Sequence, residues 1–328
     1  MCAGMNARAV DSVLTRAVAA PRSVSADELK FLLACGDVGL WNEVRSAACE
    51  IRRRCGRDRV LYRALIECSN ICAKDCRYCG IRRSNGALGR YRIPVEEVIE
   101  RVECARSEGF DAVAFQGGEI ESYANTAYYE EILASCGGLE VTLSLGEQSV
   151  ETYSRWKAAG ALRYLLRIET SNADLYRALH PAECSFERRV ECIRNLKKVG
   201  YITGTGVMIG FPGQEYADLA DDVLFFGSVD ADMVGMGPWI PHPAAALSSS
   251  AEFDAGRAVE ISCRMISLTR LYLHDVNIVS ATALEALAGA EGRQLGLDAG
   301  ANVVMPNFTP DIYRREYDLY PGKTGCAK

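Results

Sequence analysis

The chain has 328 residues, of which 49% are hydrophobic, and its net charge is −6 at pH 7. This length allows a large buried core, and the acidic balance argues against nucleic acid as a main partner. No apolar run reaches the 18 residues that a membrane-spanning helix needs, and the apolar stretch near the start is too short for a secretory signal. We therefore expect a cytoplasmic protein that acts on neither a membrane nor a nucleic acid.

The first 55 residues predict helices and no strand. Ser25 and Glu28 have the spacing of a capping box, so a helix should begin there and run through Ala34. We expect a helical extension over residues 1–55, a main domain over residues 56–323 and a short tail over residues 324–328.

From residue 60 onward, short apolar or β-branched runs alternate with amphipathic helical stretches. The predicted strands are Val60–Cys68, Ala112–Gln116, Leu139–Leu145, Arg163–Glu169, Ile202–Ile209, Met233–Pro238, Val276–Ser280 and Ala301–Met305. The predicted helices are 94–109, Ser149–Ala159, Phe186–Val199, Gln214–Phe226, Phe253–His274 and one after Ala283 that Gly289 and Gly292 interrupt. Eight such units predict the α/β class and a TIM-type (β/α)8 barrel, with a doubly wound open sheet as the alternative.

Most of the 14 cysteines are isolated on helical patterns, which is typical of core packing. One stretch groups Cys72, Cys76 and Cys79 as C-x3-C-x2-C directly after the first predicted strand, on the face where a TIM barrel carries its chemistry. Three thiolates can hold three irons of a 4Fe-4S cluster and leave the fourth iron open, whereas electron-transfer clusters use four. The open iron can bind S-adenosylmethionine (SAM), and an electron from the cluster can then break its S–C5′ bond.

Cys68 offers an alternative, because together with the three loop cysteines it would complete a four-thiolate zinc site. Cys68, however, lies within the last residues of the predicted strand, and zinc leaves the motifs further along the chain unexplained. We therefore expect Cys72, Cys76 and Cys79 to ligate the metal without Cys68.

Further motifs follow the cysteine loop in order, most of them at predicted strand ends. They include Gly80-Ile-Arg-Arg-Ser-Asn85, Arg90-Tyr-Arg92, Gln116-Gly-Gly-Glu119, Leu143-Ser-Leu-Gly-Glu147, Gly204–Gln214, Met233–Pro243, Ala301–Asn307 and Tyr317-Asp-Leu-Tyr-Pro-Gly-Lys323. Over residues from about 60 to 323, the sequence resembles the radical SAM maturases of FeFe-hydrogenase, which are related to biotin synthase and methylornithine synthase.

The resemblance implies one site-differentiated 4Fe-4S cluster, SAM, and reduced ferredoxin or flavodoxin as electron donor. It also implies a small cysteine-bound iron carbonyl cyanide substrate in assembly of the hydrogenase H-cluster, with other maturases as partners. Matching positions give SAM-binding roles to Tyr78, Gln116, Gly117, Gly118, Glu119, Ser144, Arg167, Glu169 and Arg188. Substrate-facing roles fall to Arg163, Thr142, Thr282, Met305, Tyr317 and Tyr320.

Plainer interpretations stay open for several of these residues. The glycine pair could form only a tight turn, Arg167 and Glu169 could form a structural ion pair, and the Met and Tyr residues could be core. Lysine, as in methylornithine synthase, is an alternative substrate whose ammonium group Glu119 or Glu147 could bind. A biotin synthase needs a second cluster inside the barrel, and the later predicted strands contain no cysteine. A scaffold that binds SAM without cleaving it is a further alternative.

The sequence departs from the family pattern in three places. Ile168 replaces the usual His of an Arg-His-Glu motif, and Val279–Ala283 replaces Pro-Ala-Thr-Thr-Ala, with the loss of a hydroxyl from the expected substrate pocket. Only Cys326 stands where many relatives have three more cysteines, so we expect no peripheral second cluster.

Overall fold

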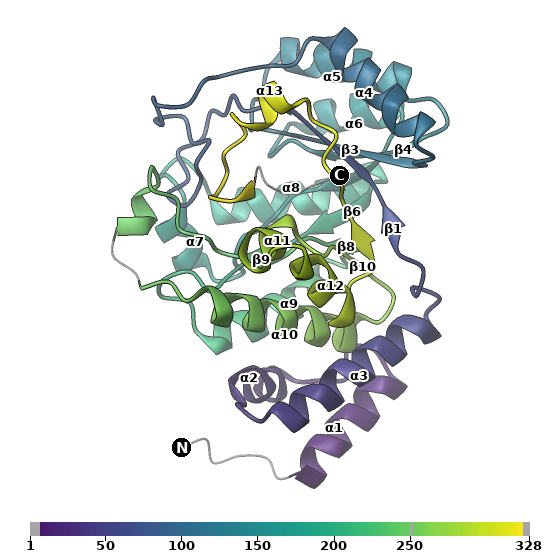
Figure 1. Cartoon of the computed structure of the whole chain (residues 1–328), viewed down its shortest axis with the longest axis vertical. Helices are drawn as coiled ribbons and strands as arrows, with labels where there is room; N and C mark the ends of the chain where they lie inside the picture. The colour runs from purple at the N-terminus through teal and green to yellow at the C-terminus, as the bar shows by residue number, and fades with distance from the viewer. Residues whose placement is uncertain (1–6, 250–251, 324–328) are drawn as a thin grey trace.

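A computed structural model describes residues 7–249 and 252–323 (Figure 1). Its central feature is a seven-stranded sheet in which every pair of neighbouring strands is parallel, in the order β10-β8-β6-β5-β4-β3-β2. The strands are β2 (Ala64–Ser69), β3 (Ala112–Gly117), β4 (Glu140–Ser144), β5 (Ala161–Leu165), β6 (Ile202–Thr205), β8 (Met233–Val234) and β10 (Asn277–Ile278).

The segment around β11 (Val303–Val304) joins the two edges of this sheet. It pairs with β1 (Leu61–Tyr62), and its neighbourhood bridges to both β2 and β10. The N–H of Ser280 donates to Val303 O at 2.9 Å, and the N–H of Phe308 donates to Leu65 O at 2.7 Å. The structure therefore confirms the predicted TIM-type barrel and not the alternative, a doubly wound open sheet.

Helices follow the strands around the outside of the barrel. The sequence predicted α4 (Val95–Ser107), α6 (Val150–Ala158), α8 (Phe186–Val199), α9 (Tyr216–Ser228) and α10 (Ala255–Leu273). Three further helices were not predicted from the sequence: α5 (Tyr123–Ser135), α7 (Ala173–Leu179) and α13 (Asp311–Arg314). The predicted interrupted helix is two helices, α11 (Thr282–Ala288) and α12 (Glu291–Asp298), which Gly289 separates at a φ of 63°. The remaining short elements are β7 (Met208–Ile209), β9 (Gly237–Pro238) and the 3-10 turn η1 (Ala246–Ser249).

Three N-terminal helices, α1 (Ala7–Ala19), α2 (Ala26–Ala34) and α3 (Val38–Arg54), pack beneath α9 and α10 (Figure 1). The capping box at Ser25 is present as predicted. Arg264 on α10 donates to Leu33 O at 2.8 Å, and Arg52 donates to Leu297 O at 2.8 Å. These bonds tie the extension to the barrel, while the predicted tail, residues 324–328, lies outside the described residues.

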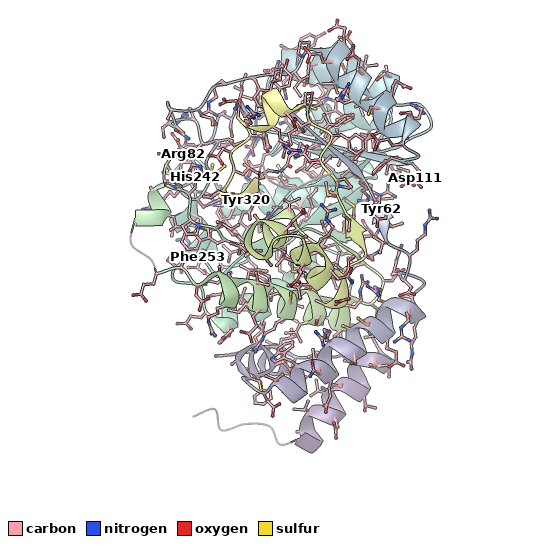
Figure 2. All side chains as sticks on the ribbon, in the orientation of Figure 1. Tyr62, Arg82, Asp111, His242, Phe253 and Tyr320 are labelled. Atoms are coloured by element: carbon pink, nitrogen blue, oxygen red, sulfur yellow. The ribbon has the colours of Figure 1, made fainter. Side chains whose placement is uncertain are left out.

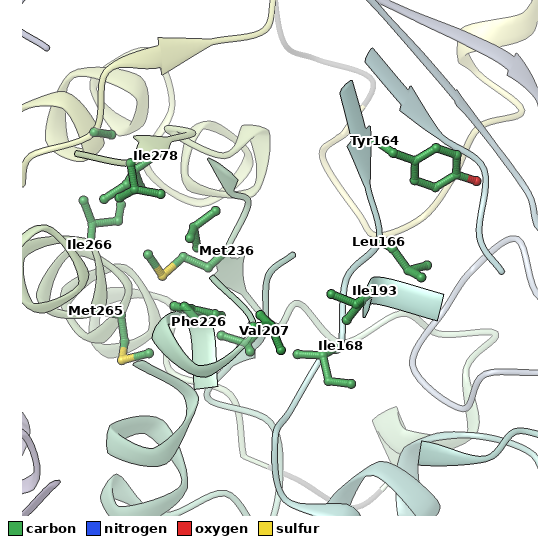
Figure 3. Packing of buried hydrophobic residues seen from close by; sticks show 14 of the residues in the cluster. Tyr164, Leu166, Ile168, Ile193, Val207, Phe226, Met236, Met265, Ile266 and Ile278 are labelled. Carbon is green, nitrogen blue, oxygen red and sulfur yellow. The ribbon is translucent and has the colours of Figure 1, made fainter. Parts of the chain in front are cut away.

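The hydrophobic core fills the layer between barrel and helices, where Ile168, Ile193 and Val207 lie close together (Figure 3). Along β5, Tyr164 faces this layer and Leu165 faces the barrel interior, because strand residues alternate between faces. Among the described residues, no helix is long and apolar enough to cross a membrane.

Candidate active site

A cavity of about 280 Å³ opens where the barrel strands end. It is lined by residues that follow or end β2, β3, β4, β5, β8 and β10, and by the C-terminal segment Tyr317–Lys323. Of the residues predicted from the sequence, it gathers Cys72, Cys76, Cys79, Tyr78, Gln116, Gly117, Gly118, Glu119, Ser144, Arg167, Glu169, Thr282, Tyr317 and Tyr320.

The cysteine loop rests directly on the end of β3. The backbone N–H groups of Lys74 and Glu119 each donate to Cys72 Sγ at 3.4 Å. A Cβ on Gly118 would lie 2.2 Å from Ile71 O and 2.8 Å from Cys72 Cβ. A side chain at position 118 would therefore collide with the cysteine loop, so glycine is required here whether or not a ligand also approaches this backbone.

The three loop cysteines all line the cavity and are partly buried. Burial raises the pKa of the Cys79 thiol to about 12 and also raises the pKa values of Cys72 and Cys76. Metal binding must therefore displace protons from these thiols. Three thiols facing one cavity suit the three-ligand cluster that their spacing predicts.

Cys68 does not join them. Its side chain is fully buried in the core beside Tyr129, and burial raises its pKa. The packing of Cys68 therefore argues against the four-thiolate zinc site.

Glu119 belongs to a buried network of ion pairs. Its carboxylate lies 3.2 Å from Lys74 Nζ and 3.5 Å from Arg189 Nη2. Arg189 is only 8% exposed, lines the cavity and lies 2.6 Å from Glu147. This arrangement presents a cation and a carboxylate side by side, which is a setting for a zwitterionic ligand.

The sequence analysis selected Arg188 for this position and missed Arg189. The Arg188 side chain is 51% exposed, pairs with Glu147 and Glu121, and does not line the cavity. Successive residues point about 100° apart on a helix, and Arg189 shares the buried face of α8 with Ile193 and Leu196. The apolar residues four and seven positions after Arg189 were the sequence signal that places Arg189 on the buried face of this helix.

The segment after β5 turns sharply at Glu169, whose φ is +67°. Its N–H donates to Gly206 O at 3.0 Å, and its carboxylate lies 2.9 Å from Arg167 Nη2. Burial raises the pKa of Glu169, while Arg167 opposes this rise. A non-glycine residue at positive φ is strained and is found more often at functional sites.

Tyr78 packs edge-on against His180 with ring centroids 5.6 Å apart. His180 Nδ1 lies 2.8 Å from Tyr176 O, which can only accept, so Nδ1 carries the proton and Nε2 accepts from the Tyr78 hydroxyl at 3.3 Å. Burial, reinforced by Arg189, lowers the pKa of His180 to about 3. The imidazole is therefore neutral and holds the Tyr78 ring at the cavity wall.

The opposite wall comes from α11 and the C-terminal segment. Thr282 Oγ1 and the Tyr320 hydroxyl are 2.6 Å apart. Lys323 forms an ion pair with the fully buried Glu67, and its ammonium lies 5.3 Å from the centre of the Tyr317 ring. Neither Lys323 nor Glu67 was selected from the sequence.

Three predicted substrate residues do not line this cavity: Arg163, Thr142 and Met305. Arg163 and Thr142 are paired between β5 and β4, below the cavity. Arg163 Nη1 lies 2.7 Å from Glu140, which begins β4 at the lower end of the barrel. Arg163 Nε and Thr142 Oγ1 are buried and make no hydrogen bond within the described structure.

Residues 66–226 match the family model described as the radical SAM superfamily. The [FeFe] hydrogenase maturase subunit HydE of Thermotoga maritima is 45% identical to this chain over 304 residues, covering 92% of this chain and 85% of that protein. The chain belongs to this maturase family. It is therefore a radical SAM enzyme, and its superfamily implies a 4Fe-4S cluster and SAM.

More distant relatives share the architecture. The 3-methylornithine synthase of Methanosarcina barkeri is 28% identical over 294 residues, covering 87% of this chain and 80% of that protein. A crystal structure of methylornithine synthase superposes with a TM-score of 0.80 at 24% identity, covering 89% of this chain and 85% of that one. This structural likeness bears on the fold alone.

The departures from the maturase pattern differ in position. Ile168 is fully buried in the core (Figure 3) and is not among the residues that line the cavity, so the absence of a histidine there does not change the cavity lining. Ala281 does line the cavity, so the altered Val279–Ala283 segment removes a hydroxyl from the wall that carries Thr282.

Proposed function

We propose that this enzyme cleaves SAM reductively and acts on a small anionic iron carbonyl cyanide complex bound to cysteine, during assembly of the FeFe-hydrogenase H-cluster. We propose further that it works in the cytoplasm with the other maturases, and that reduced ferredoxin or flavodoxin supplies its electron. The observation that supports this best is one cavity with three thiols on one wall and hydroxyls beside a lysine on the other.

Cys72, Cys76 and Cys79 would hold the 4Fe-4S cluster, which with bound SAM supplies a 5′-deoxyadenosyl radical. Glu119 would accept a hydrogen bond from the SAM amino group, and Arg189 takes the carboxylate role that we first gave to Arg188. The charges of both residues are already balanced by Lys74 and Glu147, so a zwitterion can bind without leaving a buried charge unpaired.

The groups beneath and opposite the cluster favour an anionic substrate. The unused Arg163 Nε and Thr142 Oγ1 would donate hydrogen bonds to a ligand that reached the lower barrel. Higher up, the Lys323 ammonium, whose charge Glu67 balances, lies in the cavity wall with the Thr282–Tyr320 hydroxyl pair.

A lysine substrate is disfavoured by the same charges. Its side-chain ammonium would need a carboxylate beyond those that bind SAM. Glu119 and Glu169 are the carboxylates in the described cavity lining, and we assign both to SAM. A biotin synthase reaction is disfavoured because the loop cysteines are the only ones lining the cavity in the described structure.

Anaerobic incubation of the cluster-loaded enzyme with dithionite, SAM and one candidate at a time tests the substrate. The candidates are the cysteine iron dicarbonyl cyanide complex, lysine and dethiobiotin. We expect only the iron complex to increase SAM consumption, and Arg163→Ala to abolish that increase. Conversion of lysine to a branched amino acid without a response to the iron complex would replace the maturase proposal. SAM binding without any cleavage would indicate a scaffold.

A further inference from the structure

The segment that carries the cysteine loop has a net charge opposite to that of the whole molecule. Residues 72–92 carry six basic side chains and one acidic one, a net charge of +5, in a chain whose net charge is −6. Arg82 lies at the edge of the molecule on the same side as His242, and Asp111 and Tyr62 lie on the other side (Figure 2). This basic segment follows β2 and therefore lies at the end of the barrel where the cavity opens.

Arg77 is the central residue of this surface. It is exposed and lies between the ligands Cys76 and Cys79 in the sequence. Its backbone N–H donates to Leu179 O and its carbonyl accepts from Leu247 N–H, both at 2.9 Å. These bonds fix Arg77 where the cysteine loop meets α7 and η1, only one or two peptide units from two cluster ligands.

Neighbouring arginines extend the surface. The Arg83 side chain is 58% exposed, Arg177 on α7 is 65% exposed, and Arg90 is also exposed. Acidic side chains offset part of this charge. Asp75 and Glu183 pair with Arg83, and Asp75 also lies 3.9 Å from Arg82. Asp174 pairs with Arg177. Within the described structure, by contrast, Arg77 and Arg90 hydrogen-bond only to backbone carbonyl oxygens. Their charges are therefore not neutralised by the chain.

Resting on the proposed function, we propose that the surface formed by Arg77, Arg82, Arg83, Arg90 and Arg177 docks an acidic one-electron carrier protein. The carrier donates one electron to the cluster through the loop and leaves oxidised by one electron. Complementary charge raises encounter rates tenfold to a thousandfold, and redox partners use small, transient interfaces of this kind. A carrier held at Arg77 has the shortest route to two cluster ligands.

The test compares reduction by a protein and by a small molecule. Cluster-loaded enzyme is mixed with a reduced acidic flavodoxin or with dithionite, and loss of the cluster absorbance is followed in stopped flow at low and high salt. In the double variant Arg77→Glu/Arg83→Glu, reduction by flavodoxin should slow at least tenfold at low salt. Reduction by dithionite and SAM cleavage with dithionite should stay within about twofold, and calorimetry should show weaker flavodoxin binding to cluster-free protein.

The matched control is Arg53→Glu/Arg59→Glu, which makes the same change in net charge at two exposed residues near the opposite end of the barrel. It should leave flavodoxin reduction unchanged. Equal rates in the docking variant and this control would overturn the docking surface, and so would a parallel loss with dithionite, which would show damage to the cluster. A wild-type enzyme that dithionite reduces but that cleaves no SAM would instead contradict the proposed function.

Discussion

The two walls of the cavity are built in different ways. On the cluster wall, Glu119, Arg189 and their partners form a connected ionic network whose members follow consecutive strands. On the opposite wall, the hydroxyls of Thr282 and Tyr320 pair with each other, and the ion pair between Glu67 and Lys323 joins residues 256 positions apart. The first wall holds its charges in balance around a place for a zwitterion, whereas the second carries a hydroxyl pair and a lysine whose charge Glu67 balances.

This difference separates two requirements of the chemistry. SAM has the same charged groups in every member of the superfamily, so a rigid network that neutralises them can be shared. The substrate varies, and a wall that lies outside this ionic network can change with it. Ala281, the departure that reaches the cavity, lies on this second wall.

The largest expected effect concerns the three cysteines that we propose as cluster ligands. Cys72→Ala, Cys76→Ala and Cys79→Ala should each lose the cluster after anaerobic reconstitution, because three thiolates already leave one iron open. Cys68→Ala is the matched control and should keep about four irons per chain, while it loses about 1 kcal/mol of stability from the core. Iron analysis and denaturant unfolding measure both quantities. Retention of iron in Cys72→Ala with its loss in Cys68→Ala would reverse the assignment.

The second prediction tests whether one ion pair fixes the opposite wall. Lys323→Met leaves the fully buried Glu67 without its cation, which should lower the free energy of unfolding by about 3–5 kcal/mol. The double variant Glu67→Leu/Lys323→Met removes both charges and should recover most of that loss. If the single and double variants unfold at the same denaturant concentration, the pair does not anchor the wall.

The third prediction concerns the support of the Glu169 turn. Asp222 on α9 accepts hydrogen bonds from the N–H and hydroxyl of Ser171 at 2.6 and 2.7 Å, and burial raises its pKa from 3.8 to about 7. The folded state therefore binds this proton more tightly, so its contribution to stability is complete below about pH 4 and is lost as the pH rises to about 7. Relative to Asp222→Asn, the wild type should lose up to about 4 kcal/mol across that window. If the unfolding free energies of the wild type and Asp222→Asn change in parallel with pH, this prediction is wrong.

The smallest predicted effect distinguishes two neighbouring arginines of the cluster wall. Arg189→Ala should weaken SAM binding about tenfold or more, because a charge-assisted hydrogen bond contributes roughly 1.5–3 kcal/mol. Arg188→Ala, which removes a half-exposed side chain outside the cavity, should change the affinity less than about threefold, as screened surface pairs do. Calorimetry with cluster-loaded protein measures both, and a larger effect at Arg188 would restore the sequence-based choice.

The cluster wall could be predicted from sequence largely because its signals are local. The cysteine spacing and Gln116–Glu119 fall within short segments at strand ends. The strand that we predicted over Arg163–Glu169 was shifted, since β5 covers Ala161–Leu165 and the chain turns at Glu169. A glutamate at positive φ leaves no trace in a sequence, because only glycine and asparagine commonly indicate that conformation.

The sequence contains weaker signals for the opposite wall of the cavity and for some of the helices. Glu67 and Lys323 meet across 256 positions, and no periodic pattern links them. Helix α5 was missed because its buried face includes Asn125 and Thr126, which interrupt the apolar stripe on which the prediction depended.

The contacts between the cysteine loop and the C-terminal segment affect how the enzyme must be made. Gly80 N–H donates to Leu319 O at 3.1 Å, Asn70 Nδ2 donates to Glu316 O at 2.7 Å, and a Cβ on Gly80 would lie 1.9 Å from Asp318 O. The ribosome synthesises residues 316–319 after every strand of the barrel, so a nascent chain cannot hold the loop in its final shape. Because the loop carries Cys72, Cys76 and Cys79, these side chains reach the arrangement described here only after the C-terminal segment has been synthesised and has packed against the loop.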